Sequence, residues 1–151
     1  MSAPPSKNRE VKLVRHVRGE IHPEDFTVLE TAISAPESHE VVVRNRWFRV
    51  SISTRLMAQE DATAAEGIPF PPLNPGDTLA DGAIGEVVQA GPGCAIPVGS
   101  LVMHPFGWRE YAVVREQDCR LIDCTEPDPV AYLGHGWTAY AALTRGVQVR
   151  D

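Results

Sequence analysis

The sequence of 151 residues is poor in the features that mark several classes of protein. It has three cysteines, Cys94, Cys119 and Cys124, an odd number that argues against a disulfide framework and suits a reducing compartment. The 14 Lys and Arg are scattered among 20 Asp and Glu, so we expect no nucleic-acid partner. No apolar run approaches the roughly 20 residues of a membrane helix, and the N-terminus lacks the apolar centre of a secretory signal. We therefore expect a cytoplasmic protein without a membrane partner.

Two further patterns are missing. No Gly-x-Gly-x-x-Gly occurs, so the glycine-rich turn that anchors a dinucleotide pyrophosphate is not present in this chain. Cys119 and Cys124 are too far apart for a Cys-x-x-Cys pair, and the five histidines show no metal-ligand spacing. We expect surface or turn roles for those histidines, which are His16, His22, His39, His104 and His135.

What is present predicts one mainly β domain. The run 39–53 is rich in β-branched and aromatic residues and gives the strongest strand signal. Further strands are expected near 11–17 and in three runs separated by Gly and Pro turns, 83–91, 99–106 and 108–123. Gly82 and Gly85 fall in a strand-like run, where glycine usually marks a bulge or a close backbone approach. This rhythm of short strands favours an antiparallel barrel or sandwich.

The remaining segments have other compositions. Residues 1–8 contain two prolines and two serines without an apolar pattern, which predicts a disordered tail with structure beginning near Arg9. Helix-favouring residues predict a short helix within 54–67, and a second helix is predicted around 136–145, ending at Gly146.

In order, seven short motifs resemble the N-terminal, GroES-like domain of medium-chain dehydrogenase/reductases, and more closely the zinc-independent leukotriene B4 dehydrogenase, prostaglandin reductase and 2-alkenal reductase branch. They are PEDF (23–26), EVVVRN (40–45), PFPPLNPGD (69–77), DGAIGEVV (81–88), PVGSLV (97–102), GWREYAVV (107–114) and GHGWTAYAAL (134–143). The resemblance implies a partly open antiparallel β-barrel over residues 9–131. It also implies that 132–151 form a hinge and first helix leading towards a Rossmann nucleotide-binding domain that this chain does not contain.

The resemblance implies an activity as well: NADPH-dependent reduction of the C=C bond of α,β-unsaturated ketones or aldehydes. The expected partners are a small enone or enal substrate, the nucleotide-binding domain of the same parent protein and, in that parent, a second copy in a homodimer. We expect the isolated chain to be inactive and to carry no bound NADPH. The alternative is a stand-alone GroES-like binding or assembly module without enzymatic activity.

The candidate substrate residues follow the central strand. Zinc-using relatives carry a Cys zinc ligand at the position of Ser51 and a His ligand near Asp81, so the resemblance implies that no zinc is bound. The branch has Asp-Pro-Tyr-Met-Arg where this chain has Ser51 to Arg55, which leaves Ser51, Ser53 and Arg55 as candidate substrate-binding residues. Ser53 replaces a cleft tyrosine and could donate a hydrogen bond to a carbonyl oxygen, or it could be a turn residue at the strand end.

Three candidate cofactor residues lie near the C-terminus. Gly136, Thr138 and Tyr140 match the Gly-x-Thr-Ala-Tyr element that lies beside the nicotinamide ring in the family. Thr138 could bind the carboxamide of that ring, or it could be a helix N-cap or a core threonine.

Overall fold

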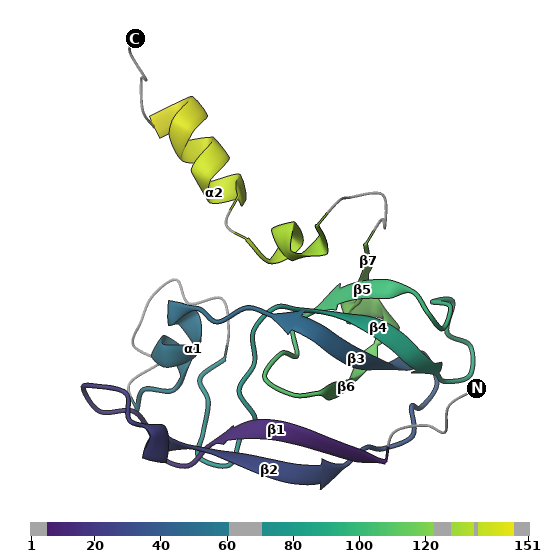
Figure 1. Cartoon of the computed structure of the whole chain (residues 1–151), viewed down its shortest axis with the longest axis horizontal. Helices are drawn as coiled ribbons and strands as arrows, with labels where there is room; N and C mark the ends of the chain where they lie inside the picture. The colour runs from purple at the N-terminus through teal and green to yellow at the C-terminus, as the bar shows by residue number, and fades with distance from the viewer. Residues whose placement is uncertain (1–5, 61–70, 123–127, 135, 147–151) are drawn as a thin grey trace.

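The protein folds into two antiparallel sheets with a few short helices (Figure 1). The computed structural model describes residues 6–60, 71–122, 128–134 and 136–146. Strands β1 (Lys7–Leu13) and β2 (Phe26–Ala32) form a two-stranded sheet. The second sheet has the strand order β6–β3–β4–β5–β7, from strands β3 (Glu40–Phe48), β4 (Ala83–Ala90), β5 (Leu101–His104), β6 (Tyr111–Arg115) and β7 (Arg120–Leu121). The prediction of a mainly β, partly open antiparallel barrel is therefore confirmed.

The N-terminal strand begins earlier than the composition predicted. β1 starts at Lys7, within the expected tail of residues 1–8, and Asn8 is buried. The side-chain oxygen of Asn8 accepts a hydrogen bond of 2.9 Å from the backbone N–H of Tyr111. Asn8 is buried because its side chain binds a backbone N–H of another segment and not because it is apolar. The hydrophobic pattern therefore did not predict that the strand includes Asn8. Residues 1–5 lie outside the described part of the chain.

The central strand β3 supplies much of the core because its first half alternates between two buried faces. Val41, Val42 and Val43 are each 0% exposed. Val41 and Val43 belong to one apolar cluster, with Val87, Ile96, Val102, Ala112 and Val114. A second cluster joins β1 to α1 and contains Leu13, Val17, Met57, Ala58, Leu73 and Leu79. Full burial of each such aliphatic side chain contributes about 1.5–3 kcal/mol, so the first cluster stabilises the larger sheet and the second holds β1 against α1.

The pairing of β3 with β4 is interrupted by register shifts between Val42 and Val43 and between Asn45 and Trp47. Gly85 lies on β4 opposite this irregular stretch, and a Cβ atom there would lie 2.5 Å from the carbonyl oxygen of Arg44. The expected close backbone approach is thus confirmed at Gly85. At Gly82 the nearest atom to such a Cβ would be a side-chain carbon of Leu133 at 3.5 Å, an ordinary contact.

The predicted strand at 108–123 is instead two strands. β6 ends at Arg115, a 3-10 turn, η3 (Glu116–Asp118), follows it, and β7 pairs with β5 at the opposite edge of the sheet. The backbone N–H of Cys119 donates to the carbonyl oxygen of Glu116, which closes the turn. No Gly or Pro marks this turn, so the residue types alone did not reveal it.

The helices are short. The 3-10 turn η1 (Pro23–Asp25) precedes β2, and α1 (Ile52–Met57) follows β3; the remainder of the predicted 54–67 helix lies largely outside the described residues. A 3-10 segment, η4 (Pro129–Leu133), packs near β4 and leads to α2 (Gly136–Ala141), which continues as a π-helical turn, η5 (Ala142–Gly146). The expected C-terminal helix is therefore present, and it stands away from both sheets (Figure 1).

Candidate functional site

A buried carboxylate gathers the chain segments that follow β3 and precede β4. The side chain of Asp81 is 0% exposed. Its Oδ1 accepts from Arg49 through Nε at 2.8 Å and Nη2 at 2.7 Å, and from the backbone N–H of Gly82 at 2.7 Å. Its Oδ2 accepts from the hydroxyls of Ser51 at 2.5 Å and Thr54 at 3.4 Å. We call these five residues, Arg49, Ser51, Thr54, Asp81 and Gly82, the Asp81 cluster.

The charge state of Asp81 follows from these partners. Burial is the largest single influence and raises the pKa of this carboxyl, because it disfavours the charged form. The hydrogen bonds from Arg49, Ser51 and Gly82 together outweigh it, so the pKa of Asp81 lies below its ordinary value. Asp81 is thus a carboxylate at neutral pH, and Arg49 supplies the neutralising charge.

Local backbone structure brings these residues together. β3 ends at Phe48, after which the backbone N–H of Arg49 donates to the carbonyl oxygen of Gly82 at 2.8 Å. Ser51 is the N-cap of α1, and its Oγ accepts from the backbone N–H of Ser53 at 3.2 Å. One hydroxyl therefore both caps the helix and binds the carboxylate, which fixes the start of α1 against β4.

Two cavities border the Asp81 cluster, and Arg49 and Leu133 line both. One has a volume of about 260 Å³ and is lined also by Gly82, Met103, His104, Pro105, Asp118, Arg120 and Tyr132. The other has a volume of about 370 Å³ and is lined also by Arg46, Trp47, Phe48, Val130 and Gly134. Leu133 is the last residue of η4. The end of η4 and the side chain of Arg49 thus border both cavities.

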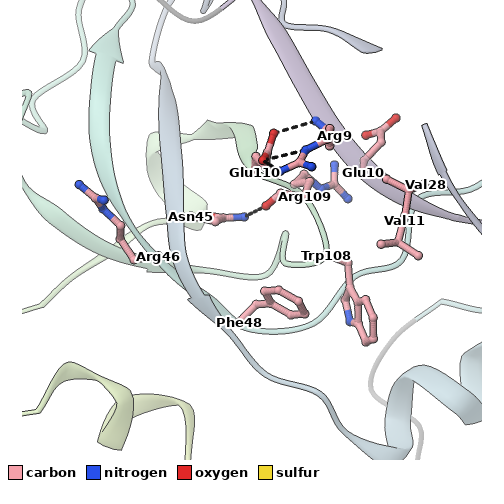
Figure 2. Close-up of a pocket in the computed structure, with 10 residues that line it drawn as sticks. All are labelled: Arg9, Glu10, Val11, Val28, Asn45, Arg46, Phe48, Trp108, Arg109 and Glu110. Atoms are coloured by element: carbon pink, nitrogen blue, oxygen red, sulfur yellow. Dashed lines mark hydrogen bonds and ion pairs between the residues drawn. The ribbon is translucent and has the colours of Figure 1, made fainter. Parts of the chain in front are cut away.

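A third cavity of about 270 Å³ lies between β1 and the end of β3 (Figure 2). Figure 2 shows the ion pair of Arg9 with Glu110 at one end and the Phe48 and Trp108 rings, 5.1 Å apart, at the other. The indole Nε1 of Trp108 is buried and has no hydrogen-bond partner among the described residues. None of the residues predicted to bind substrate or cofactor lines this cavity.

A second polar cluster lies beside the first and surrounds a buried histidine. His104 is 3% exposed; its Nε2 lies 2.8 Å from Oδ1 of Asn45, and its Nδ1 accepts from the backbone N–H of Phe106 at 3.2 Å. The amide of Asn45 donates to the carbonyl oxygens of Phe106 and Arg109. Burial, with the charge of Arg109 as a lesser cause, lowers the pKa of His104 to about 4. The expectation of a surface or turn role is wrong for His104, which is a neutral core histidine.

The three predicted substrate residues have different surroundings. Ser51 belongs to the Asp81 cluster. Ser53 is partly buried in the first turn of α1, and no hydrogen bond of its hydroxyl is found within the described residues. Arg55 donates from Nη2 to the carbonyl oxygen of Gly19 at 2.6 Å, which ties α1 to the loop after β1. The structure thus brings Ser51 together with Asp81 and gives Arg55 a backbone partner elsewhere.

The predicted cofactor residues share one helix. Gly136, Thr138 and Tyr140 all lie in α2 and are exposed, Tyr140 by 59%. Thr138 lies within the helix and is not buried, so it is neither the N-cap nor a core threonine. A Cβ atom at Gly136 would have no neighbour within 4 Å. These residues are accessible to a bound group, but by themselves they enclose no site.

The metal-binding residue types are dispersed. Within the described ranges, no three His, Cys, Asp or Glu side chains lie together as ligands of one ion would. Cys94 and Cys119 are free thiols that pack against the same apolar cluster, and burial, followed by the proximity of Cys94, raises the pKa of Cys119 to about 11. Cys124 lies outside the described residues. No helix in the described part of the chain is long and apolar enough to cross a membrane.

The sequence reasoning missed Arg49 as a site residue and considered Asp81 only as a lost zinc-ligand position. The available signal was an ionisable residue between Ala80 and Gly82 at the start of a buried strand, a position that calls for a partner. Nothing in the sequence indicated which cation that partner would be.

Solved structures share this arrangement of sheets. The chain superimposes on CurA from Vibrio vulnificus in complex with NADPH with a TM-score of 0.76 at 21% identity, covering 89% of this chain and 40% of that one. It superimposes on the quinone oxidoreductase of Escherichia coli complexed with NADPH with a TM-score of 0.65 at 17% identity, covering 95% and 42%. The chain therefore shares its fold, the expected GroES-like one, with the matched parts of these two proteins.

Sequence comparison assigns the family. Residues 9–122 match the family model described as the N-terminal domain of oxidoreductase, and the chain belongs to this family. It is also 28% identical over 142 residues to YfmJ of Bacillus subtilis, which is named as an NADP-dependent oxidoreductase. That match covers 91% of this chain and 40% of YfmJ, so the chain spans about 40% of the length of this relative.

Proposed function

We propose that this chain is the substrate-side domain of an NADPH-dependent oxidoreductase that reduces the C=C bond of α,β-unsaturated ketones or aldehydes. The observation that carries the proposal is the Asp81 cluster, in which a buried carboxylate fixes hydrogen-bond donors at the border of two largely apolar cavities. Such a site offers a conjugated carbonyl apolar walls and a positive charge for its oxygen.

The cofactor is proposed from the relatives and from α2. YfmJ is named for NADP, and CurA was solved with NADPH. The exposed residues Gly136, Thr138 and Tyr140 fit contact with the nicotinamide end alone, because the chain has no glycine-rich turn for a pyrophosphate. We therefore assign the rest of the dinucleotide to a nucleotide-binding domain of the same parent protein, and we propose a cytoplasmic enzyme that can form a homodimer.

The proposed reaction adds a hydride and a proton across the C=C bond. NADPH, when bound, would supply a hydride, which is two electrons and one proton, and would be released as NADP⁺. The hydride forms a C–H bond at the β-carbon of the substrate, the C=C π pair moves towards the carbonyl, and an enolate oxygen results. A proton from water then forms the second C–H bond at the α-carbon, which yields the saturated ketone or aldehyde. The residues of this domain orient the carbonyl, exclude bulk water and stabilise the oxygen while it is negative.

The proposed mechanism uses no zinc. Ser51 and Asp81, at or near the positions where zinc-using relatives have ligands, are bound to each other at 2.5 Å, and Asp81 already has Arg49 as its counter-ion. Elemental analysis of the purified protein should find zinc well below one atom per chain, and a chelator should leave the melting temperature unchanged. One zinc per chain, with loss of stability on chelation, would contradict this part of the proposal.

Ser53 is proposed as a second donor to the substrate. In the protein that contains both this domain and a nucleotide-binding domain, Ser53→Ala should reduce enone turnover more than it reduces stability, because a bond to a developing oxyanion is felt mainly in the transition state. Steady-state kinetics beside thermal melting separate the two effects. Equal kinetics for wild type and variant with several enones would leave Ser53 as a turn residue.

The function itself is tested by product analysis. The full-length protein is incubated with NADPH and cinnamaldehyde, and the products are separated. We expect hydrocinnamaldehyde, the product of C=C reduction, together with NADPH consumption of equal stoichiometry. Cinnamyl alcohol would instead show carbonyl reduction, and absence of NADPH consumption with cinnamaldehyde, methyl vinyl ketone and cyclohexenone would favour the non-enzymatic binding module.

A further inference from the structure

We propose that Arg49 is a catalytic residue of this site, with its outward guanidinium edge binding the carbonyl oxygen of the acceptor. The inference rests on the proposed function and adds to it the group that stabilises the enolate. It assigns to Arg49 a role in the transition state beyond that of a counter-ion for Asp81.

The position of the guanidinium is fixed from behind. Nε and Nη2 of Arg49 both bind Oδ1 of Asp81, whose side chain is fully buried and is held in turn by Ser51 and Gly82. A cation held on one edge by a buried carboxylate keeps its planar orientation without a contribution from the ligand. The cost of ordering the Arg49 side chain is therefore met on folding rather than on binding.

The other edge of the guanidinium is available. The Arg49 side chain is 27% exposed, and its Nη1 has no hydrogen-bond partner among the described residues. Arg49 also lines the cavities of about 260 and 370 Å³ on either side of Leu133. A carbonyl oxygen in either cavity could thus approach an N–H group that is already oriented.

Other basic residues around these cavities are engaged differently. Arg46 donates to Glu86 at 2.8 Å, and the guanidinium of Arg120 lies over the Tyr132 ring, 5.8 Å from its centre. His104, which lines the smaller cavity, uses both ring nitrogens within its own cluster. Within the described residues bordering the two cavities, Arg49 therefore combines fixed orientation with unused donors.

The cavity walls increase what such a donor contributes. Met103, Leu133 and Val130 provide apolar surface beside Arg49, where a hydrogen bond from a cation to an oxyanion is stronger than in water. The charge on the substrate oxygen is small in the ground state and full in the enolate. Loss of Arg49 should consequently lower kcat far more than it raises KM.

The kinetic test uses a variant that preserves the pairing without charge. In the full-length protein, Arg49→Gln combined with Asp81→Asn replaces the ion pair by two amides that can bind each other, which avoids an unpaired buried carboxylate. We expect kcat for cinnamaldehyde to fall about 100-fold, KM to change by less than about threefold and NADPH affinity to be unchanged. Arg44→Gln, an exposed change on β3 five residues before Arg49, should retain wild-type kinetics. A folded double variant with kcat within about threefold of wild type would overturn the inference while leaving the proposed function intact.

A binding measurement on this chain tests Arg49 even if the full-length protein reduces no enone. Cyclohexenone is titrated into the ¹⁵N-labelled chain while the Nε–H signal of Arg49 is followed by NMR. We expect a saturable shift of that signal, and we expect binding to be weaker by less than about threefold for the double variant, because the oxygen of the unreacted enone carries little charge. Saturable binding elsewhere without a shift at Arg49, or no saturable binding at all, would contradict the inference.

Discussion

The two polar clusters near the end of β3 differ in charge and in how many of their hydrogen-bond donors are engaged. In one, Asn45 and His104 form a neutral and closed set of hydrogen bonds. In the other, the carboxylate of Asp81 is buried but its partner Arg49 reaches the border of two cavities. In the first cluster, both ring nitrogens of His104 are hydrogen-bonded within the fold. In the second, Nη1 of Arg49 has no hydrogen-bond partner among the described residues.

Of the two clusters, the Asp81 cluster is the better candidate for function. Both clusters are satisfied internally, so burial and perturbed pKa values do not separate them. What separates them is that Arg49 lines two cavities and its Nη1 has no hydrogen-bond partner within the described part of the chain, while the His104 ring nitrogens are both bonded. Removing a member of each cluster should therefore have effects of different kinds.

The largest effect on stability is expected for Asp81→Ala. This change leaves Arg49 without its counter-ion and removes the acceptor of the Ser51 hydroxyl and the Gly82 N–H, which should lower the free energy of unfolding by about 4 kcal/mol. Because the pKa of folded Asp81 is lowered, its contribution is complete above its ordinary value of 3.8 and is lost as the pH falls below that value. Urea denaturation at neutral pH and in acid measures both. Asp118→Ala, at an exposed carboxylate, is the matched control, and equal midpoints for the two variants would contradict the account.

A somewhat smaller effect is expected from acid at His104. The pKa of this histidine is lowered from 6.5 to about 4. Between pH 6.5 and about 4, His104 is therefore protonated in the unfolded chain and neutral in the folded chain. Stability should fall by about 3 kcal/mol as the pH decreases from 6.5 to about 4 and should show no further loss from this group below that. His104→Gln should flatten the slope in denaturation curves across this range, whereas the exposed His22→Gln should keep it. An unchanged slope in His104→Gln would place the titrating group elsewhere.

The smallest of the three effects is expected for Ser51→Ala. The hydroxyl of Ser51 caps α1 and binds Asp81, but Asp81 keeps its bonds from Arg49 and Gly82 without it. We expect a loss of about 1 kcal/mol, typical of an N-cap. Ser53→Ala, two residues along the same turn, should cost less than about 0.5 kcal/mol. Thermal melting of the two variants checks this prediction. A larger loss of stability for Ser53→Ala than for Ser51→Ala would contradict it.

The sequence predicted the parts of this structure that depend on local pattern. The β-branched run of β3, the close approach at Gly85 and the helix at Gly136–Ala141 follow from residue types in a short window. Ser51 was named from the family resemblance, because zinc-using relatives have a ligand at its position. Arg49 and Asp81 are separated by 32 positions, and neither residue type nor spacing indicates that two such distant side chains meet. The same holds for Asn45 and His104, 59 positions apart, so both clusters emerge only from the packing of strands.

In the proposed function this chain provides the substrate side of the reaction and another domain provides the main dinucleotide anchor, and a titration of NADPH into the isolated chain tests that division most directly. In that arrangement the residues of α2 contact the nicotinamide end alone, and such contacts would not offset the cost of ordering a flexible dinucleotide. Isothermal titration calorimetry should therefore give a dissociation constant in the millimolar range or weaker, which corresponds to roughly 4 kcal/mol or less. A micromolar dissociation constant would contradict the account, because it would require a cofactor site within these 151 residues.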